Sequence, residues 1–396
     1  MSSRPDEAPD AVGRLKPGLG CVDDLTMRVL AHEWLVSAAG SDKVAARIAR
    51  ALGIDEVITA FSDPAIARAL LGDVRVRNLW TNHLPGIADA RMAYAPAILA
   101  AWAGCKVGNA ELLISNAHFG ATGAGRRFDG PHVAMCHSPM RYAWRTDLES
   151  DRLTGVAGRV GRAIVPALQR FDRRSADSVS LFLGNSSSIA RRIEDAYGRP
   201  AAVVHPVVDV DRFTDLSDGL VHARSGGHYL CFGRVVAYKR VDLAVRACTA
   251  RSLPRVVAGA GPEVAGLRNI AGPTVTFEEQ VSDARYRELL AGARALLFPG
   301  EEDFGIVPVE AMAAGVPVIA FGRGGALDTI VDGVTGVLFP EQSVDSLVGA
   351  IELLEATTFD VAKLRAQADC FRPEVFDERL RSVVAGHLAA GVRDRY

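Results

Sequence analysis

The stretch RALLFPGEEDFGIVPVEAMAAGVPVIAF (294–321) contains a complete strand–loop–helix–strand unit. RALLFP (294–299) and PVIAF (317–321) are short apolar runs of the kind that form buried strands. Between them, Pro308 suits the first turn of a helix and Gly315 suits its C-terminal cap. Because a helix between two strands is the connection that parallel pairing requires, the stretch predicts an α/β fold.

The same alternation of apolar runs and amphipathic segments continues along the chain from Met27. Helical patterns lie between most of the runs, for example at 42–52 and 154–174. Parallel sheets that are covered by helices on both faces give this pattern. We expect strands at RVLAH (28–32), EVITAF (56–61), VRVRNLW (74–80), ELLIS (111–115), HVAMCH (132–137) and VSLFLGN (179–185), and then at HYLCFG (228–233), RVVAG (255–259), TVTF (274–277), RALLFP (294–299), PVIAF (317–321) and GVLF (336–339).

Two such series predict two doubly wound, Rossmann-like domains that face each other across a cleft. We expect the first domain at 27–204 and the second at 214–375, joined by an extended, Pro-containing linker at 205–213. The polar, Pro- and Gly-rich segment 1–26 predicts a flexible tail. The segment 376–396 predicts a C-terminal helix that packs back on the first domain.

Composition limits the class of protein. The net charge of −2 gives no reason to expect a nucleic-acid partner. No apolar run approaches the ~20 residues that a membrane-spanning helix needs. The six cysteines include no C-x-x-C pair, which favours reduced thiols over a zinc site or a disulfide framework. Since the N-terminal segment also lacks the apolar core of a signal peptide, we expect a cytoplasmic protein.

Two glutamates bracket the apolar part of the opening stretch. Glu302 falls in the loop after the strand, and Glu310 falls in the first turn of the helix. The amides of a helix N-terminus bind anions, and a carboxylate on either side can accept hydrogen bonds from hydroxyl groups. A nucleotide sugar fits this pattern, because its diphosphate lies between two groups with hydroxyls, the sugar and the ribose. The alternative is that Glu310 complements the helix dipole and Glu302 is a solvated loop residue.

Cations and glycines follow two other strands of the second half. In CFGRVVAYKRVDLAV (231–245), Arg234, Lys239 and Arg240 suit a diphosphate. A cluster of solvated charges would give the same sequence pattern. RVVAGAGPEVAG (255–266) is a weak dinucleotide fingerprint because its third glycine comes late. It also suits a loop that lets a nucleotide base approach the backbone.

Together these segments resemble the retaining family 4 glycosyltransferases, which have the two-domain GT-B fold. The motifs that carry the resemblance are EEDFGIVPVEAMAAGVPVIA, GRVVAYKRVDLAV, VAGAGPE, GGALDTIVDGVTGVLF, MCHSPMRYAW, NSSSIARRIEDAYG and HPVVDVDRF. DFGIVPVEA and CHSPMRYAW are most similar to bacterial mannosyltransferases of O-antigen and exopolysaccharide assembly. The resemblance implies that mannose is transferred from GDP-mannose, without a metal, to a glycan or polyprenyl-linked acceptor.

The resemblance also implies roles for single residues. Arg234 and Lys239 would hold the donor diphosphate, Glu302 the sugar hydroxyls and Glu310 the ribose, while His118 matches the family's active-site histidine. His118, Arg234, Lys239 and Glu302 are therefore the expected catalytic residues. The other donor-binding residues are expected to be Gly40, Gly259, Gly261, Val281, Phe304, Gly305, Ile306 and Val307. His137, Arg141 and Tyr142 are expected on the acceptor side, with packing as their alternative role.

Several alternatives stay open at this point. DVD (209–211) has the D-x-D pattern of metal-dependent transferases, but we interpret it as a structural turn and expect no metal or other cofactor. The basic amphipathic segment 152–174 predicts either contact with the inner membrane or a core-packed helix with a solvated basic face. The rival functions are a UDP-sugar-dependent glucosyl-, galactosyl- or N-acetylglucosaminyltransferase, a nucleotide-sugar epimerase, and a non-catalytic nucleotide-sugar-binding protein.

Overall fold

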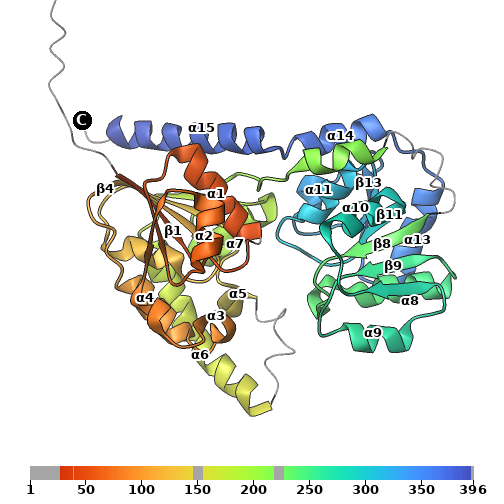
Figure 1. The fold of residues 1–396 in the computed structure, drawn as a ribbon, viewed down its shortest axis with the longest axis horizontal. Coiled ribbons are helices and arrows are strands. Elements are labelled where there is room, and N and C mark those ends of the chain that lie inside the picture. Colours follow the sequence, from red (N-terminus) through yellow and green to blue (C-terminus); the bar gives the residue numbers. More distant parts are fainter. Residues whose placement is uncertain (1–26, 39, 146–154, 218–226, 394–396) are drawn as a thin grey trace, which may run out of the picture.

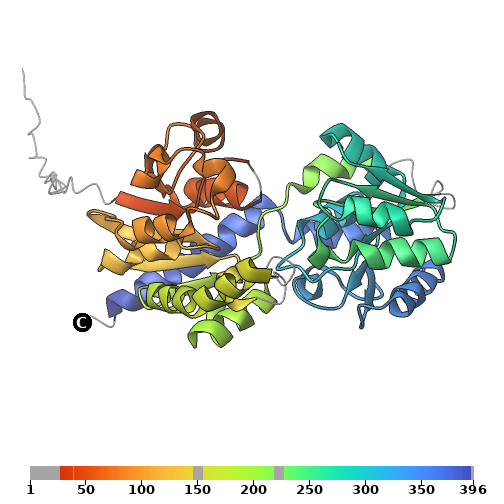
Figure 2. The same cartoon turned by 90° about the horizontal axis from the view of Figure 1, so that it is seen from below.

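The computed structural model describes residues 27–38, 40–145, 155–217 and 227–393, without the side chains of 155–162, 217 and 391–393. The expected tail at 1–26 lies outside the described residues. Two parallel sheets, one of seven and one of six strands, form the centres of two domains that lie side by side (Figures 1 and 2). This arrangement confirms the predicted α/β fold class with two doubly wound domains.

The first sheet has the strand order β3-β2-β1-β4-β5-β6-β7, and all neighbouring pairs are parallel. Its strands are β1 (Met27–His32), β2 (Glu56–Thr59), β3 (Arg75–Asn78), β4 (Ala110–Ala117), β5 (His132–Cys136), β6 (Leu181–Gly184) and β7 (Ala201–Val203). Its helices are α1 (Gly40–Leu52), α2 (Pro64–Leu71), α3 (Ile87–Ala90), α4 (Ala95–Ala103), α5 (Arg141–Trp144), α6 (Gly155–Ala176) and α7 (Ser187–Tyr197), with 3-10 turns η1 (Trp80–His83) and η2 (Ala121–Arg127).

The second sheet has the order β10-β9-β8-β11-β12-β13 and is parallel as well. Its strands are β8 (His228–Phe232), β9 (Arg255–Ala258), β10 (Val275–Glu278), β11 (Ala293–Phe298), β12 (Val318–Phe321) and β13 (Gly336–Phe339). Its helices are α8 (Val241–Ala250), α9 (Val264–Ile270), α10 (Asp283–Ala291), α11 (Ile306–Ala313), α12 (Ala326–Thr329), α13 (Val344–Glu355) and α14 (Val361–Asp369), with η4 (Val210–Ser217) and η6 (Ala237–Lys239).

Both sheets bury apolar side chains on both faces. Successive residues of a strand point to opposite faces. Leu30 of β1 accordingly joins one core cluster, and its neighbours Val29 and Ala31 join another. In β8, Leu230 and Tyr229 are divided between two clusters in the same way. Burial on both faces explains why the strands read as continuous apolar runs in the sequence.

The strand at Ala201–Val203 was missing from the sequence-based prediction. Its three residues pair with β6 at the edge of the sheet, where they are only half-buried. The predicted strand at 56–61 is too long, because β2 ends at Thr59 while the buried Phe61 lies in the following loop. Ala60 and Phe61 are buried although they follow the strand, so the apolar run continues past its end.

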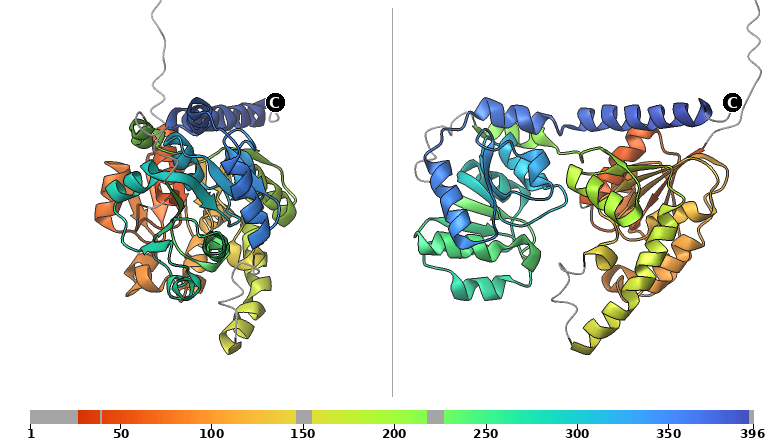
Figure 3. Two further views of the ribbon diagram at one scale, coloured as in Figure 1. Left: turned by 90° about the vertical axis from the view of Figure 1, so that its right-hand side faces the viewer. Right: turned by 180° about the vertical axis from the view of Figure 1, so that it is seen from behind.

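The last helix, α15 (Pro373–Arg393), leaves the second domain and lies along the first (Figures 1 and 3). Arg47 of α1 donates from Nε and Nη2 to the two carboxylate oxygens of Asp377, at 2.7 and 2.8 Å. Phe376 and Leu380 are buried in the core of the first domain. The helix begins three residues before the predicted start at 376. In the described chain, no helix combines the length and the apolar character that crossing a membrane requires.

Candidate active site

A cleft of about 1170 Å³ lies between the two domains, at the carboxyl ends of the strands of both sheets. Ten of the predicted site residues line it: Gly40, His118, His137, Arg141, Tyr142, Arg234, Glu302, Phe304, Gly305 and Ile306. Of the others, Lys239 lines a small adjoining pocket together with Arg234 and Glu302. Gly259, Gly261, Val281, Val307 and Glu310 do not line the cleft.

The loop from β11 to α11 lines the cleft on the side of the second domain. Phe304 is buried, and Gly305 has a φ of 95°, a left-handed conformation that favours glycine. This turn starts α11 at the cleft wall. The first-turn amides of Ile306 and Val307 have no acceptor within the helix, so they are available to an anion. Pro308 lies in the same turn, where the absence of its N–H costs nothing.

Two of the predicted cations, Lys239 and Arg234, differ in whether they form an ion pair. Lys239 Nζ lies 2.8 Å from Glu302 Oε1, and both side chains are about four-fifths buried. The guanidinium of Arg234 is exposed to the cleft and has no ion pair or hydrogen bond with another described residue. An unpaired guanidinium that faces a cleft suits a diphosphate.

Glu310 lies in the second turn of α11 and not in the first as expected, because the helix begins at Ile306. It does not line the cleft, and the hydroxyl of Tyr286 donates to its Oε2 at 2.8 Å. Tyr286 in turn stacks on Phe232, with ring centroids 3.6 Å apart. Burial raises the pKa of the Glu310 carboxyl, and the Tyr286 hydrogen bond and the charges of Arg212 and Lys43 oppose that rise. A ribose at this position would therefore have to share the carboxylate with Tyr286.

The two glycines that were expected to hold a base serve close packing of two loops. A Cβ on Gly259 would lie 2.1 Å from the carbonyl oxygen of Gly233, and one on Gly261 would lie 2.0 Å from that of Val235. The loop after β9 is thereby pressed against the loop that carries Arg234. Val281 and Val307, which were also expected to contact the donor, pack against the apolar core of the second domain.

The first domain supplies the opposite wall. The His118 ring packs edge-on against Trp34, with centroids 5.2 Å apart, and Tyr142 packs edge-on against Phe119 at 5.8 Å. Burial, with help from the charges of His32 and Arg141, lowers the pKa of His118 to about 4. His118 therefore faces the cleft as a neutral imidazole.

Sequence reasoning missed Glu33, which fixes the backbone of this wall. Its side chain is fully buried, and Oε1 accepts hydrogen bonds from four successive amides, at 2.9, 2.7, 3.0 and 3.3 Å. These amides belong to His118, Phe119, Gly120 and Ala121. The only signal in the sequence was a charged residue directly after an apolar strand.

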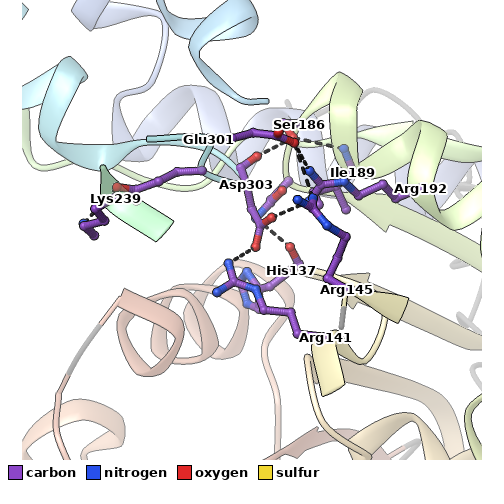
Figure 4. Close-up of polar contacts among 11 residues, drawn as sticks. His137, Arg141, Arg145, Ser186, Ile189, Arg192, Lys239, Glu301 and Asp303 are labelled. Atoms are coloured by element: carbon purple, nitrogen blue, oxygen red, sulfur yellow. Dashed lines mark hydrogen bonds and ion pairs between the residues drawn. The ribbon is translucent and has the colours of Figure 1, made fainter. Parts of the chain in front are cut away.

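Sequence reasoning also missed an ion-pair cluster between the domains, formed by Glu301 and Asp303 with Arg141, Arg145 and Arg192 (Figure 4). Asp303 pairs with Arg141 and, at 2.7 Å, with Arg192 Nη1. Glu301 pairs with Arg192 and, at 3.4 Å, with Arg145. The run of three acids at 301–303 was visible, but only Glu302 drew an interpretation. The two flanking acids attach the Glu302 loop to the opposite domain.

The basic segment 152–174 is only partly described. Leu168 and Phe171 of α6 pack against the core of the first domain, while Ile164 is 51% exposed. Figure 3 shows α6 reaching away from the body of that domain. Residues 152–154 and the side chains of 155–162 lie outside the described residues, so the membrane hypothesis stays a prediction.

The D-x-D segment lies away from the cleft. Asp211 belongs to η4 and pairs with Arg372 Nη1 at 2.7 Å, which agrees with a structural turn. Among the residues that the structure describes, no group of three or more His, Cys, Asp or Glu side chains is placed to hold a metal ion.

Comparison with known proteins connects this geometry to a family of domains. Residues 222–369 match the family described as "Glycosyl transferases group 1". Curated relatives from Mycobacterium tuberculosis and Mycobacterium bovis, each described as a D-inositol 3-phosphate glycosyltransferase, are 27% identical over 327 residues. The match covers 75% of this chain and 65% of each relative, so the chain spans less than two thirds of their length.

Solved structures show the same fold at low sequence identity. HepE of Anabaena, in complex with UDP and glucose, has a TM-score of 0.66 and 17% identity over 91% of this chain and 99% of its own. The lipopolysaccharide outer core galactosyltransferase WaaB has a TM-score of 0.66 at 14% identity, with the same coverage. Sucrose-phosphate synthase of Thermosynechococcus elongatus reaches 0.67 at 17% identity, over 92% of this chain and all of its own. Residues 222–369 thus form a glycosyl transferases group 1 domain, and they do so within a GT-B fold.

Proposed function

We propose that the protein is a retaining, metal-independent family 4 glycosyltransferase that moves a hexose from a nucleotide sugar to an acceptor in the interdomain cleft. The observation that carries the proposal is the unpaired Arg234, which faces the cleft beside the Lys239–Glu302 pair and the N-terminus of α11. The group 1 domain supports it, because residues 222–369 contain this whole donor side.

The proposed mechanism follows from where charge develops. Departure of the nucleoside diphosphate puts negative charge on its outer phosphate, and Arg234, Lys239 and the amides of α11 would stabilise it. Glu302 would exchange Lys239 for sugar hydroxyls when the donor binds, which would free the ammonium group for the phosphate. No protein nucleophile is required, since the departing phosphate can take the proton of the attacking hydroxyl.

The donor has two candidates. The sequence resemblance favours GDP-mannose, in the assembly of cell-surface polysaccharide or glycolipid. The solved structure of HepE with UDP and glucose favours a UDP sugar instead. For the acceptor we propose a glycan, in the first place a polyprenyl-linked one, which would bring the enzyme to the cytoplasmic face of the membrane. A phosphorylated cyclitol is the second candidate, because the curated relatives carry inositol phosphate in their names.

Thermal unfolding in EDTA with a panel of nucleotides and nucleotide sugars tests the donor. A ligand at 100 times its dissociation constant adds about 2.7 kcal/mol to the free energy of unfolding. A selective shift with GDP and GDP-mannose would support mannosyl transfer, whereas a shift with UDP sugars alone would change the donor and keep the site. A folded protein that no member of the panel stabilises would refute the donor site.

Arg234→Ala separates an enzyme from a protein that only binds nucleotide sugars. For the enzyme we expect turnover of the donor to fall by about 100-fold or more, since the lost cation stabilises charge that develops as the donor departs. Arg246→Ala, an exposed arginine of α8, is the matched control and should leave turnover unchanged. Donor binding by the wild type without any transfer or slow hydrolysis would favour the non-catalytic alternative.

A further inference from the structure

A chain of buried polar side chains leads from the first turn of α1 to the cleft. His137 Nε2 lies 2.8 Å from Asn116 Oδ1, and Asn116 Nδ2 lies 3.0 Å from His32 Nδ1. His32 Nε2 lies 3.1 Å from Asp42 Oδ1. His32, Asp42 and Asn116 are at most 1% exposed, while His137 lines the cleft. Four polar side chains in this setting are costly to bury unless each one is paired.

The carbonyl of Ser41 fixes the orientation of the Asn116 amide. Asn116 Nδ2 lies 3.0 Å from that oxygen, which can only accept a hydrogen bond, so the NH₂ group must be on this side. The amide oxygen therefore faces His137 and accepts from it. Since an oxygen cannot donate, the proton on the ring of His137 must be on Nε2. This assignment does not depend on the tautomer of His32.

We propose that Asn116 holds His137 as the neutral tautomer protonated on Nε2, so that its Nδ1 accepts a hydrogen bond from the acceptor hydroxyl that attacks the donor. The assignment of the hydroxyl rests on the proposed transferase function. Nδ1 has no hydrogen-bond partner within the described chain. His137 would then touch the acceptor directly, and Asn116, His32 and Asp42 would be positioning residues.

The surroundings of His137 suit an acceptor of hydrogen bonds rather than a base. Burial, with the neighbouring His118, His32 and Arg141, lowers its pKa to about 3, while Asp303 opposes this. A ring that resists protonation can orient a hydroxyl without removing its proton. The proton then stays available to the departing phosphate.

Nitrogen NMR of the full chain labelled with ¹⁵N-histidine tests the tautomer without any ligand. Correlations from the ring carbon protons to both ring nitrogens distinguish the two neutral forms and the cation. The signals of His137 are assigned from those missing in His137→Ala. We expect the Nε2–H form from pH 5.5 to 8. A neutral Nδ1–H form or an imidazolium at pH 7 would overturn the proposal.

Two variants test the role of Asn116. In Asn116→Asp a carboxylate replaces the amide oxygen, and we expect the pKa of His137 to rise by more than one unit, which a purely structural side chain would not cause. If this buried variant fails to fold, the NMR spectrum of His137→Ala is measured instead, because that substitution removes a ring at the cleft and should be tolerated by the fold. It should shift the side-chain NH₂ signals of Asn116, and unchanged signals would contradict the hydrogen bond.

Slow hydrolysis of UDP-glucose or GDP-mannose tests the role of Nδ1, with water as the hydroxyl. We expect His137→Ala to lower the rate at saturating donor by about tenfold, as for one lost hydrogen bond, with donor affinity unchanged. His137→Gln, whose amide oxygen can replace Nδ1, should recover most of the rate. A loss of donor affinity instead would overturn the role. If the wild type hydrolyses neither donor, the proposed function fails while the tautomer is still decided by NMR.

Discussion

At the scale of the residue, Glu310 is a carboxylate whose environment opposes its charge. Burial raises its pKa, so the folded protein favours the protonated form more than the unfolded chain does. The stability it contributes is present below pH 4.5 and is lost as the pH rises through the higher folded-state pKa. Above the folded-state pKa the folded protein therefore holds an ionised group where burial opposes its charge.

We therefore expect Glu310→Gln to stabilise the ligand-free protein at pH 7 by roughly 1 kcal/mol. The amide keeps an oxygen for the Tyr286 hydroxyl, so the hydrogen bond at 2.8 Å is not lost. Nucleotide-sugar affinity should fall in the same variant if the carboxylate binds the ribose. Thermal unfolding with and without the donor measures both effects, and Tyr286→Phe is the control for the hydrogen bond. A destabilised Glu310→Gln would mean that the charge itself is needed by the fold.

His132 has the opposite dependence on pH. The ring is fully buried between the hydroxyls of Ser115 and Ser178, and burial lowers its pKa to about 4. In the unfolded chain this histidine binds a proton near pH 6.5, whereas in the folded protein it does so only near pH 4. The free energy of unfolding therefore decreases as the pH falls from 6.5 towards 4. Each such histidine contributes up to about 1.4 kcal/mol per pH unit.

Because the pKa values of His118, His137 and His228 are lowered as well, we expect the wild type to lose stability with a slope of up to four protons. In His132→Gln the slope should decrease by about one proton, because the amide can bond to both serines and does not titrate. Urea unfolding at half-unit steps from pH 7 to 4.5 gives the slope. An unchanged slope would show that His132 is already protonated in the folded protein.

At the scale of the element, the loop carrying Glu302 is held by the glycines that begin α12. A Cβ on Gly325 would lie 2.2 Å from the backbone of Phe304, and one on Gly324 would lie 2.3 Å from the carbonyl oxygen of Glu302. Backbone atoms at these distances cannot be moved aside without shifting the loop. The amide of Gly325 also donates to the Glu302 carbonyl at 2.8 Å.

We expect Gly325→Ala to cost about 3 kcal/mol of stability, the upper part of the usual range for overpacking, and to weaken donor binding because Glu302 moves. Gly349→Ala is the matched control. That glycine lies inside α13 with no atom within 4 Å of a Cβ, so alanine should stabilise the protein by up to about 1 kcal/mol. Equal effects in the two variants, measured by urea unfolding, would show that the contact with Phe304 does not constrain the loop.

How much the sequence could predict depended on whether a feature is local. Twelve of the thirteen strands, and α11, follow from patterns within a few residues and were expected. Asn116 and His32 could not be recognised, because their partners lie on other strands and helices. Gly259 and Gly261 were visible as a motif, but only the structure shows that they pack against the Arg234 loop.

At the scale of the whole molecule, the ion pairs of Glu301 and Asp303 decide how firmly the domains face each other (Figure 4). The side chains of Arg192 and Asp303 are 18% and 13% exposed, so their attraction is screened less by water than that of a surface pair. Removing one member leaves the other charge unpaired in a partly dry interface, which is the costly case. The cluster should therefore hold the closed cleft more strongly at low salt than at high salt.

We expect Asp303→Asn to cost about 2 kcal/mol, between the values for surface and buried pairs, and to increase the radius of gyration as the cleft opens. Donor affinity should fall with it, because Glu302 is the next residue. Scattering and thermal unfolding at 50 mM and 1 M salt measure these effects, and salt should move the wild type towards the variant. Glu352→Gln removes a pair with Arg251 in which both side chains are half exposed, and should cost less than 1 kcal/mol. If both variants and both salt concentrations give the same radius of gyration, the ion pairs do not hold the cleft, and packing of α15 across α1 must do so instead.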